Sequence, residues 1–282
     1  MCFKWLFKLG IVAKIFPFIL DSSLIGTIRF YLLYYAKQNQ EWGWDIDGFY
    51  SQNAERINAV VNILADEKSK YIYTGMIKFR QTRDKKDYPF HVIKETSYFI
   101  KELNLGENEV IIDCGAYDGD TIDQFLKHCP KYKQIIAFEP NSEAFHKLKQ
   151  KHGDNPKIVL HNVGVYDKNG EVPFDVSDYG DSSVMDDKEN NFPSTVQVIA
   201  IDDLHLEKVT FIKMDVEGSE LNALKGAKET IIRDHPKLAI CIYHTLEDMI
   251  CIAEYIHTLV PEYKLYVRQY DFIAETVLYA IS

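Results

Sequence analysis

Residues 110 to 121 read Val-Ile-Ile-Asp-Cys-Gly-Ala-Tyr-Asp-Gly-Asp-Thr, and this stretch decides the fold. The apolar run 110–112 predicts a buried parallel strand. Gly115 and Gly119 allow the backbone to turn sharply and to approach a ligand, and the polar pair 120–121 can cap a following helix. A strand, a glycine turn and a helix N-terminus in this order predict a cofactor-binding crevice.

The acidity of this loop narrows the choice of ligand. The loop carries Asp113, Asp118 and Asp120, and it lacks both the G-x-G-x-x-G of a dinucleotide site and the lysine of a phosphate-binding loop. Because carboxylates repel pyrophosphate, a phosphorylated cofactor is disfavoured. S-adenosylmethionine, which has a sulfonium, an ammonium and a ribose but no phosphate, fits the loop better.

A second acidic position follows at the distance that this ligand requires. The apolar segment 134–138 predicts a short strand that ends in Glu139-Pro140-Asn141, about 20 residues after the last glycine of the turn. An acid at the end of the second strand of a βαβ unit can accept hydrogen bonds from both ribose hydroxyls. We therefore predict Glu139 as the ribose ligand; the alternative is a solvated acid before a proline turn.

Length and charge exclude some classes of protein. The chain has 282 residues, of which 46% are hydrophobic, enough for one large domain or for a main domain with an extension. The formal net charge of −10 argues against an extended nucleic-acid surface, because duplex binding needs a basic face. We expect no nucleic-acid partner, and we interpret the lysine-rich segment 127–151 as a solvated helix face.

The cysteines predict a reducing environment. There are five, an odd number, and none is spaced as C-x-x-C, so reduced thiols in a cytoplasmic protein are expected. Cys114 lies inside the glycine turn, but acidic neighbours raise the pKa of a thiol and disfavour a nucleophilic thiolate. We interpret Cys114 as a small, buried packing residue.

The N-terminal third predicts helices. Three lysines and Pro17 interrupt the apolar segment 1–20, so it is a poor transmembrane span, and it has no clear cleavage site of a signal peptide. It is either a helix packed on the main domain or on a second subunit, or an interfacial helix on a membrane. From Asp47 to about Arg83 apolar residues recur at helical spacing, and the charged segment 84–87 marks a break. We expect a helical extension over residues 1–85 and the main domain over 86–282.

Strands and helices alternate after that break, which predicts an α/β domain with a mostly parallel sheet covered on both faces. An inserted hairpin, 171–174 with 196–201, flanks a polar loop at 178–191 that is long enough to be functional. The expected strands lie near residues 109–113, 134–139, 157–161, 209–214, 237–242, 263–269 and 275–281, and the helices near 95–103, 120–128, 141–151, 217–232 and 246–259.

Two acids and a histidine are candidates for the chemistry. Asp215 and Glu217 follow the strand at 209–214, and His244 follows the next strand, so all three should lie at the ligand edge of the sheet. In methyl transfer from an activated donor, the enzyme aligns the acceptor oxygen and removes its proton, for which His244 or Asp215 would be the base. Two alternatives stay open: a structural histidine, and a divalent metal held by the three side chains, which we do not favour.

With these residues identified, the chain resembles the FkbM family of S-adenosylmethionine-dependent methyltransferases from about Tyr98 onward. The segment at the fourth strand, Lys213-Met-Asp-Val-Glu-Gly218, is more specific than the glycine turn, which many methyltransferases share. The matching segments are 110–121, Phe138-Glu-Pro140, Ala200-Ile-Asp-Asp-Leu204, Phe211 to Gly218, Ile242-Tyr-His244 with Glu247-Asp248, and Glu275-Thr-Val-Leu-Tyr-Ala280.

The resemblance implies a Rossmann-like, seven-stranded methyltransferase fold and methylation of a hydroxyl on a sugar, a glycan or a secondary metabolite. It implies that Asp215 lies near the transferred methyl and that Asp181 and Ser182 are candidates to close over the cofactor. For Asn162 it implies adenine contact, with a plain loop residue as the alternative. The expected cofactor-binding residues are Asp113, Gly115, Ala116, Tyr117, Gly119, Thr121, Glu139, Pro140, Asn162, Asp181, Ser182 and Asp215, and the expected catalytic residues are Asp215, His244 and Glu217.

Two other functions compete with an O-methyltransferase. An NAD-linked dehydrogenase is disfavoured by the glycine spacing and the acidity of the loop. A non-catalytic protein that binds S-adenosylmethionine, such as a scaffold, would keep the pocket without turnover. The expected partners are a small-molecule or glycan acceptor and, through the N-terminal helices, a membrane surface or a second copy of the chain.

Overall fold

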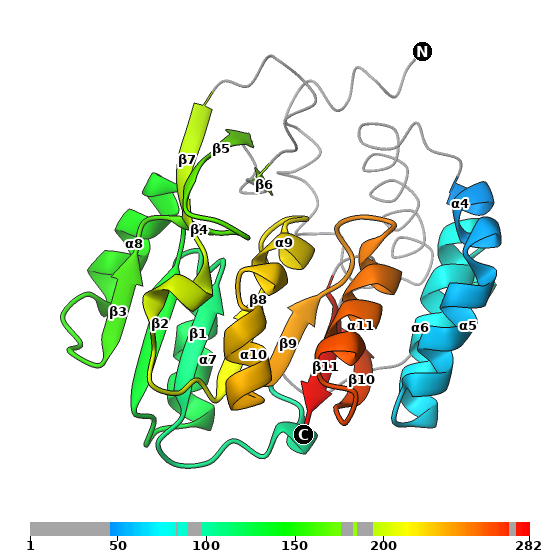
Figure 1. Ribbon diagram of the computed structural model, residues 1–282, viewed down its shortest axis with the longest axis horizontal. Helices are drawn as coiled ribbons and strands as arrows, with labels where there is room; N and C mark the ends of the chain where they lie inside the picture. The colour runs from blue at the N-terminus through cyan, green and yellow to red at the C-terminus, as the bar shows by residue number, and fades with distance from the viewer. Residues whose placement is uncertain (1–45, 83, 90–96, 176–182, 185–193, 271–274) are drawn as a thin grey trace, which may run out of the picture. The chain divides into compact units, whose positions relative to one another are not determined.

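The computed structural model describes residues 46–82, 84–89, 97–175, 183–184, 194–270 and 275–282 (Figure 1). These residues belong to one compact unit, Ile46–Ser282. The predictions for segment 1–20 lie outside the described residues. Within the described ranges, no helix combines the length and the apolar character that crossing a membrane requires.

Seven strands form the main sheet in the order β10-β11-β9-β8-β1-β2-β3, as the seven-stranded prediction expects. Neighbouring strands from β9 to β3 run parallel, whereas β11 pairs antiparallel with both β9 and β10. The strands are β1 (Val110–Cys114), β2 (Gln134–Phe138), β3 (Ile158–His161), β8 (Phe211–Met214), β9 (Lys237–Cys241), β10 (Lys264–Gln269) and β11 (Thr276–Ile281).

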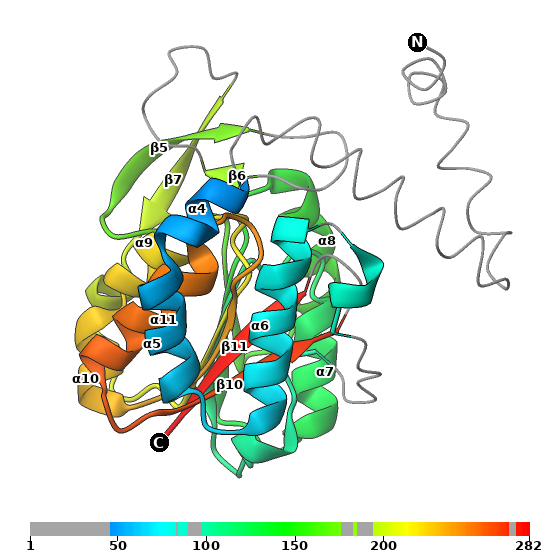
Figure 2. The same ribbon diagram turned by 90° about the vertical axis from the view of Figure 1, so that its right-hand side faces the viewer.

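Helices cover both faces of this sheet. Figure 2 shows the sheet nearly edge-on, with α9, α10 and α11 on one side and α6, α7 and α8 on the other. Every residue of β1 is buried, as the apolar run at 110–112 predicts for a central parallel strand. The helices are α4 (Ile46–Gln52), α5 (Ala54–Ile63), α6 (Glu67–Thr82), α7 (Asp120–His128), α8 (Ser142–His152), α9 (Glu220–Lys225), α10 (Lys228–Asp234) and α11 (Asp248–Leu259).

A second, small sheet lies beyond the carboxyl ends of the parallel strands (Figure 1). Its order is β4-β7-β5-β6, and β5 pairs antiparallel with β7, which confirms the predicted hairpin. Its strands are β4 (Gly164–Val165), β5 (Gly170–Asp175), β6 (Ser183–Val184) and β7 (Ser194–Ile199).

Three local predictions are wrong. The helix expected at 95–103 is, where described, a turn and extended backbone followed by the single 3-10 turn Lys101–Leu103. The helix expected at 217–232 is divided into α9 and α10 at Gly226, where a Cβ would lie 2.0 Å from the carbonyl oxygen of Tyr166. The pair 120–121 does not cap α7: the cap position is Gly119, and no side chain caps the helix there.

The helices before the sheet are anchored on its far edge. Arg268 of β10 is buried and donates hydrogen bonds to Asp66, at 2.8 Å, and to Ser69 of α6, also at 2.8 Å. Ser69 in turn accepts a hydrogen bond from the backbone N–H of Val267. The helical content predicted for residues 47–83 is therefore present, as α4 to α6. The division of the chain at residue 85 stays a prediction.

Candidate active site

The candidate site lies along the carboxyl ends of four neighbouring parallel strands. In the order of the sheet, His244 follows β9, Asp215 follows β8, Asp113 lies on β1, and Glu139 follows β2. Strands in a sheet are about 4.8 Å apart, so these four positions form a row in which Glu139 and Asp215 are two strand spacings, or about 10 Å, apart.

The glycines of the turn are required by packing within the protein. Gly115 has a φ of +76°, and a Cβ there would lie 1.8 Å from the carbonyl oxygen of Asp215. Gly119 has a φ of +90°, and a Cβ there would lie 2.6 Å from the Cδ2 of His152. The backbone contact excludes other residues at Gly115 and brings the turn against the end of β8, whereas the positive φ makes another residue strained at Gly119. Ala116 and Thr121 are buried beside them.

Among the residues between these glycines, Tyr117 exposes its side chain to solvent. Tyr117 has a φ of 45° and is 48% exposed, which is high for so large an aromatic side chain. An exposed ring at this turn is available for stacking on a ligand. The backbone N–H of Tyr117 donates a hydrogen bond, 2.9 Å long, to the carboxylate of Glu139.

The carboxylate of Glu139 is buried and held in place. Its Oε2 accepts the hydrogen bond from Tyr117, and its Oε1 accepts one from the backbone N–H of Asn141 at 2.7 Å. Burial raises the pKa of Glu139, while these two hydrogen bonds act in the opposite direction. A carboxylate oxygen can accept more than one hydrogen bond, so this group keeps the capacity to receive ribose hydroxyls.

The turn after Glu139 is braced by Asn162. The side-chain amide of Asn162 donates to the carbonyl oxygens of Glu139 and Pro140, at 2.8 and 3.2 Å, and its Oδ1 accepts from the hydroxyl of Ser142. This side chain therefore has a structural role in fixing the end of β2. Its contact with adenine stays a prediction.

A buried ion pair lies beneath the turn. Lys213 of β8 places its Nζ 3.2 Å from Oδ1 of Asp113, and both side chains are buried. The same Nζ donates to the carbonyl oxygen of Gly115 at 2.7 Å. Burial raises the pKa of Asp113 although the Lys213 cation acts against it. The lysine therefore links β8 directly to the glycine turn.

Asp215 is held by two tyrosine hydroxyls from distant parts of the chain. Tyr98 donates to its Oδ2 at 2.8 Å, and Tyr243 donates to its Oδ1 at 3.3 Å. Burial alone would raise the pKa of Asp215, but the neighbouring cations of Lys213 and His244 hold that pKa below its usual range. Asp215 is therefore an ionised and oriented carboxylate.

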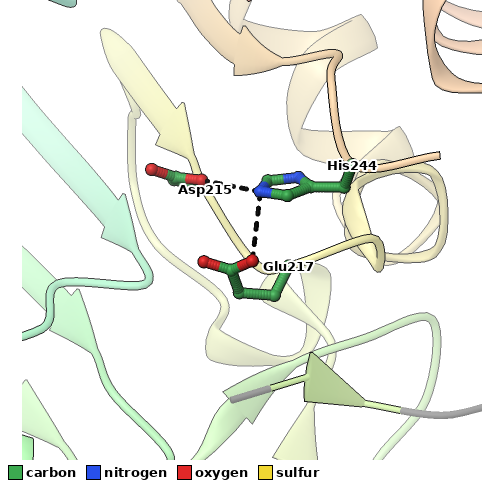
Figure 3. A group of neighbouring side chains, drawn as sticks. All are labelled: Asp215, Glu217 and His244. Atoms are coloured by element: carbon green, nitrogen blue, oxygen red, sulfur yellow. Dashed lines mark ion pairs between the residues drawn. The ribbon is translucent and has the colours of Figure 1, made fainter. Parts of the chain in front are cut away.

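The imidazole of His244 lies among three carboxylates (Figure 3). Its Nε2 is 3.3 Å from Asp215 and 3.3 Å from Glu217, and its Nδ1 is 2.9 Å from Glu220. Burial alone would lower the pKa of His244, but the three carboxylates, Glu220 first, raise it to about 10. The structure thus brings together the three residues predicted to be catalytic.

The loop that carries His244 is tied to the helical part of the chain. Arg80 of α6 is buried and donates to the carbonyl oxygens of Tyr243, at 3.0 Å, and Thr245, at 3.5 Å. It also donates to the hydroxyl of Tyr50 in α4, at 3.1 Å. These contacts flank His244 on both sides in the sequence.

Sequence reasoning missed several residues of this site. Lys213 could have been identified from the sequence, because a charged residue inside an apolar strand needs a buried partner. No local sequence pattern points to the other missed residues, which are Tyr98, Tyr243, Glu220 and Arg80. Asp181 and Ser182 lie outside the described residues. Cys114 is buried, and burial raises its pKa, which supports its interpretation as a packing residue.

Comparison with known proteins places the chain among methyltransferases. NoeI, a 2-O-methyltransferase of Sinorhizobium fredii, is 26% identical to it over 193 residues, which is 59% of this chain and 79% of NoeI. AglP, a hexuronic acid methyltransferase of Haloferax volcanii, is 27% identical over 125 residues, 43% of this chain and 50% of AglP. This chain therefore spans half the length of AglP.

A crystal structure of the methyltransferase FkbM from Methylobacillus flagellatus KT shares the fold. It aligns with a TM-score of 0.72 and 27% identity, over 84% of this chain and 61% of that one. The Methyltransferase FkbM domain matches residues 113–274, a segment that contains the glycine turn, Glu139, Asp215 and His244. The chain belongs to the FkbM methyltransferase family.

Proposed function

We propose that the protein transfers a methyl group from S-adenosylmethionine to a hydroxyl oxygen of a sugar. One observation carries the proposal: Glu139, Asp113, Asp215 and His244 form a row across four neighbouring strands in a domain of this family. The row offers a buried acid for a ribose at one end and ionisable groups for proton transfer at the other.

The cofactor half of the row, Glu139 with Asp113, fits the chemistry of S-adenosylmethionine. Neither carboxylate oxygen of Asp113 makes a hydrogen bond within the described part of the chain, although Lys213 lies close to it. Beside Asp113, the carboxylate of Glu139 suits the hydroxyl donors of a ribose and disfavours phosphate. When bound, S-adenosylmethionine supplies a methyl group that its sulfonium has already activated.

The acceptor half of the row, Asp215 with His244, orients the acceptor hydroxyl and removes its proton. The hydroxyls of Tyr98 and Tyr243 fix both oxygens of Asp215, so its carboxylate is oriented before any ligand arrives. Asp215, which is ionised, takes the proton of the acceptor hydroxyl as the new oxygen–carbon bond forms, whereas His244, with a pKa of about 10, already carries its proton. General-base catalysis of this kind contributes about 10²–10⁴-fold to a rate.

The sugar acceptor is supported by the relatives. NoeI is named as a 2-O-methyltransferase and AglP as a hexuronic acid methyltransferase. The small sheet of β4 to β7 lies at the same edge as the row, so it is placed to contribute to an acceptor site (Figure 1). A saccharide with a free ring hydroxyl is therefore the substrate class to test first.

The test uses the full chain with S-adenosylmethionine labelled in its methyl group. We expect label to appear in a saccharide from a panel that includes hexuronic acids, and not in the same saccharides after their hydroxyls have been methylated chemically. Asp215→Asn should abolish most of the transfer, whereas Glu107→Gln, a change at an exposed acid near the opposite end of β1, should not.

Two outcomes would overturn the proposal. Transfer of label only to amines or thiols would contradict a hydroxyl acceptor. Tight binding of S-adenosylhomocysteine with no transfer to any saccharide would favour the non-catalytic scaffold.

A further inference from the structure

Three potential metal ligands converge on one point at the acceptor end of the row (Figure 3). The Nε2 of His244 is 3.3 Å from a carboxylate oxygen of Asp215 and 3.3 Å from one of Glu217. The three ligand atoms all lie within 4.8 Å of one another. They come from two neighbouring loops, the one after β8 and the one after β9.

This spacing is that of ligands around a metal ion. With metal–ligand bonds of about 2.1 Å, adjacent ligand atoms are about 3.0 Å apart in octahedral geometry and about 3.4 Å apart in tetrahedral geometry. The two distances from Nε2, 3.3 Å each, fall in this range. The remaining distance, between the two carboxylate oxygens, is no more than 4.8 Å.

The ring of His244 is an independent pointer to a ligand. Its side chain is only 6% exposed, and across the described ranges neither ring nitrogen makes a hydrogen bond of good geometry. A buried polar group without such a bond is costly, so a ligand at Nε2 would remove that cost. Nε2 is aimed at the oxygens of Asp215 and Glu217, as Figure 3 shows.

The other side of the ring has the support that metal-bound histidines have. Nδ1 lies 2.9 Å from the carboxylate of Glu220, which is fully buried. Glu220 is itself held by the backbone N–H groups of Val216 and Gly218, at 2.8 and 3.0 Å. A carboxylate at the second nitrogen fixes the tautomer and leaves Nε2 to bind a metal. The hydroxyl of Tyr98 orients Asp215 in a corresponding way.

The charges and donor types select the kind of ion. Two carboxylates with one imidazole suit a hard divalent cation such as Mn²⁺ or Mg²⁺, whereas zinc and copper sites use more nitrogen and sulfur. Glu217 is 30% exposed at its side chain, so an ion can enter from solvent and keep positions for water or a substrate hydroxyl. Without a metal, protonated His244 would neutralise the charge of the same carboxylates, so a proton competes with the metal ion for this site.

We propose that Asp215, Glu217 and His244 bind a divalent cation of the Mn²⁺ or Mg²⁺ class that takes the acceptor hydroxyl as a further ligand. The catalytic part of this proposal rests on the proposed function. A bound cation would lower the pKa of that hydroxyl, and its proton would pass to the oxygen of Asp215 that does not bind the cation and then to water. The methyl–sulfur bond then breaks, with its electron pair staying on sulfur, as the oxygen–methyl bond forms.

Binding of Mn²⁺ alone to the full chain tests the site directly. We expect electron paramagnetic resonance to show one Mn²⁺ bound for each chain, without cofactor or acceptor. Glu217→Gln and His244→Gln should each weaken binding at least tenfold, because the first removes the charge of one ligand and the second removes the imidazole. The matched control Glu107→Gln should leave the affinity unchanged.

Absence of Mn²⁺ binding, or binding that neither variant weakens, would overturn the proposal. A second measurement separates it from the proposed function. If the EDTA-treated protein binds S-adenosylhomocysteine and methylates a saccharide at the full rate, the metal proposal fails and the proposed function stands. If Mn²⁺ binds as expected but S-adenosylhomocysteine does not, the site is a metal site and the proposed function fails.

Discussion

The two halves of the row differ in how they are built. The cofactor half, around Glu139 and the glycine turn, is formed by consecutive segments of one βαβ unit, and its Glu139 carboxylate is held by backbone N–H groups. The acceptor half, around Asp215 and His244, is held by side chains from distant segments, among them Tyr98 and Arg80. The first is built mainly within one βαβ unit, with Lys213 of β8 as its link to a distant segment, whereas the second is held chiefly by such distant side chains.

This difference implies that the two halves can be damaged separately. Variants in the cofactor half should lower the affinity for S-adenosylhomocysteine, and variants in the acceptor half should lower the rate of transfer. A variant that lowers both to the same extent would show that the halves are not independent.

The largest effect is expected for Asp215→Asn. The change keeps the shape of the side chain but removes its charge, so kcat should fall by about 10²–10⁴-fold. S-adenosylhomocysteine lacks both the methyl group and the sulfonium charge, so its affinity should stay within threefold of that for the unmodified protein. Single-turnover methyl transfer and isothermal titration give the two values. Equal losses in kcat and in the affinity for S-adenosylhomocysteine would show that the two halves are not independent.

Glu139→Gln should have the opposite pattern. An amide in place of the carboxylate sets its NH₂ group against the backbone N–H of either Tyr117 or Asn141 and removes one charge-assisted hydrogen bond to the ribose, worth about 1.5–3 kcal/mol. The affinity for S-adenosylhomocysteine should fall by about 10–100-fold, measured by isothermal titration. Unchanged affinity would remove Glu139 from the ribose site.

Arg80→Met tests whether the helices before the sheet serve the acceptor half. Without the guanidinium, the carbonyl oxygen of Tyr243 loses a buried donor, at a cost of about 1–3 kcal/mol, and the loop with His244 loosens. We expect kcat to fall about tenfold with little change in cofactor affinity. The control is Arg56→Met, at an exposed ion pair between α5 and Glu254. A rate equal to that of the control would limit Arg80 to a structural role.

The smallest effect is expected for Asn162→Ala. This side chain braces the turn after β2, and the loss of a neutral hydrogen bond costs about 0.5–1.5 kcal/mol. The affinity for S-adenosylhomocysteine should therefore fall about threefold, with kcat unchanged at a saturating concentration of S-adenosylmethionine. A loss as large as that of Glu139→Gln would instead indicate direct contact with the cofactor.

The same contrast explains what the sequence could predict. The alternation of strands and helices follows from apolar periodicity, the seven-stranded fold is what the family resemblance implies, and Glu139 follows from its spacing after the glycine turn. Asp215 and His244 were found because they end predicted strands. Tyr98 and Arg80 could not be found, since their partners lie 117 and 163 residues away in the sequence. The break at Gly226 was missed for the same reason, because it depends on the approach of Tyr166.

A single molecule of S-adenosylmethionine should lie across both halves of the row. A crystal structure of the full chain with S-adenosylhomocysteine tests this most directly. We predict that the ribose hydroxyls lie within hydrogen-bonding distance of Glu139 and that the sulfur points along the row toward Asp215. A nucleoside bound elsewhere, or a sulfur turned away from Asp215 and His244, would contradict the account.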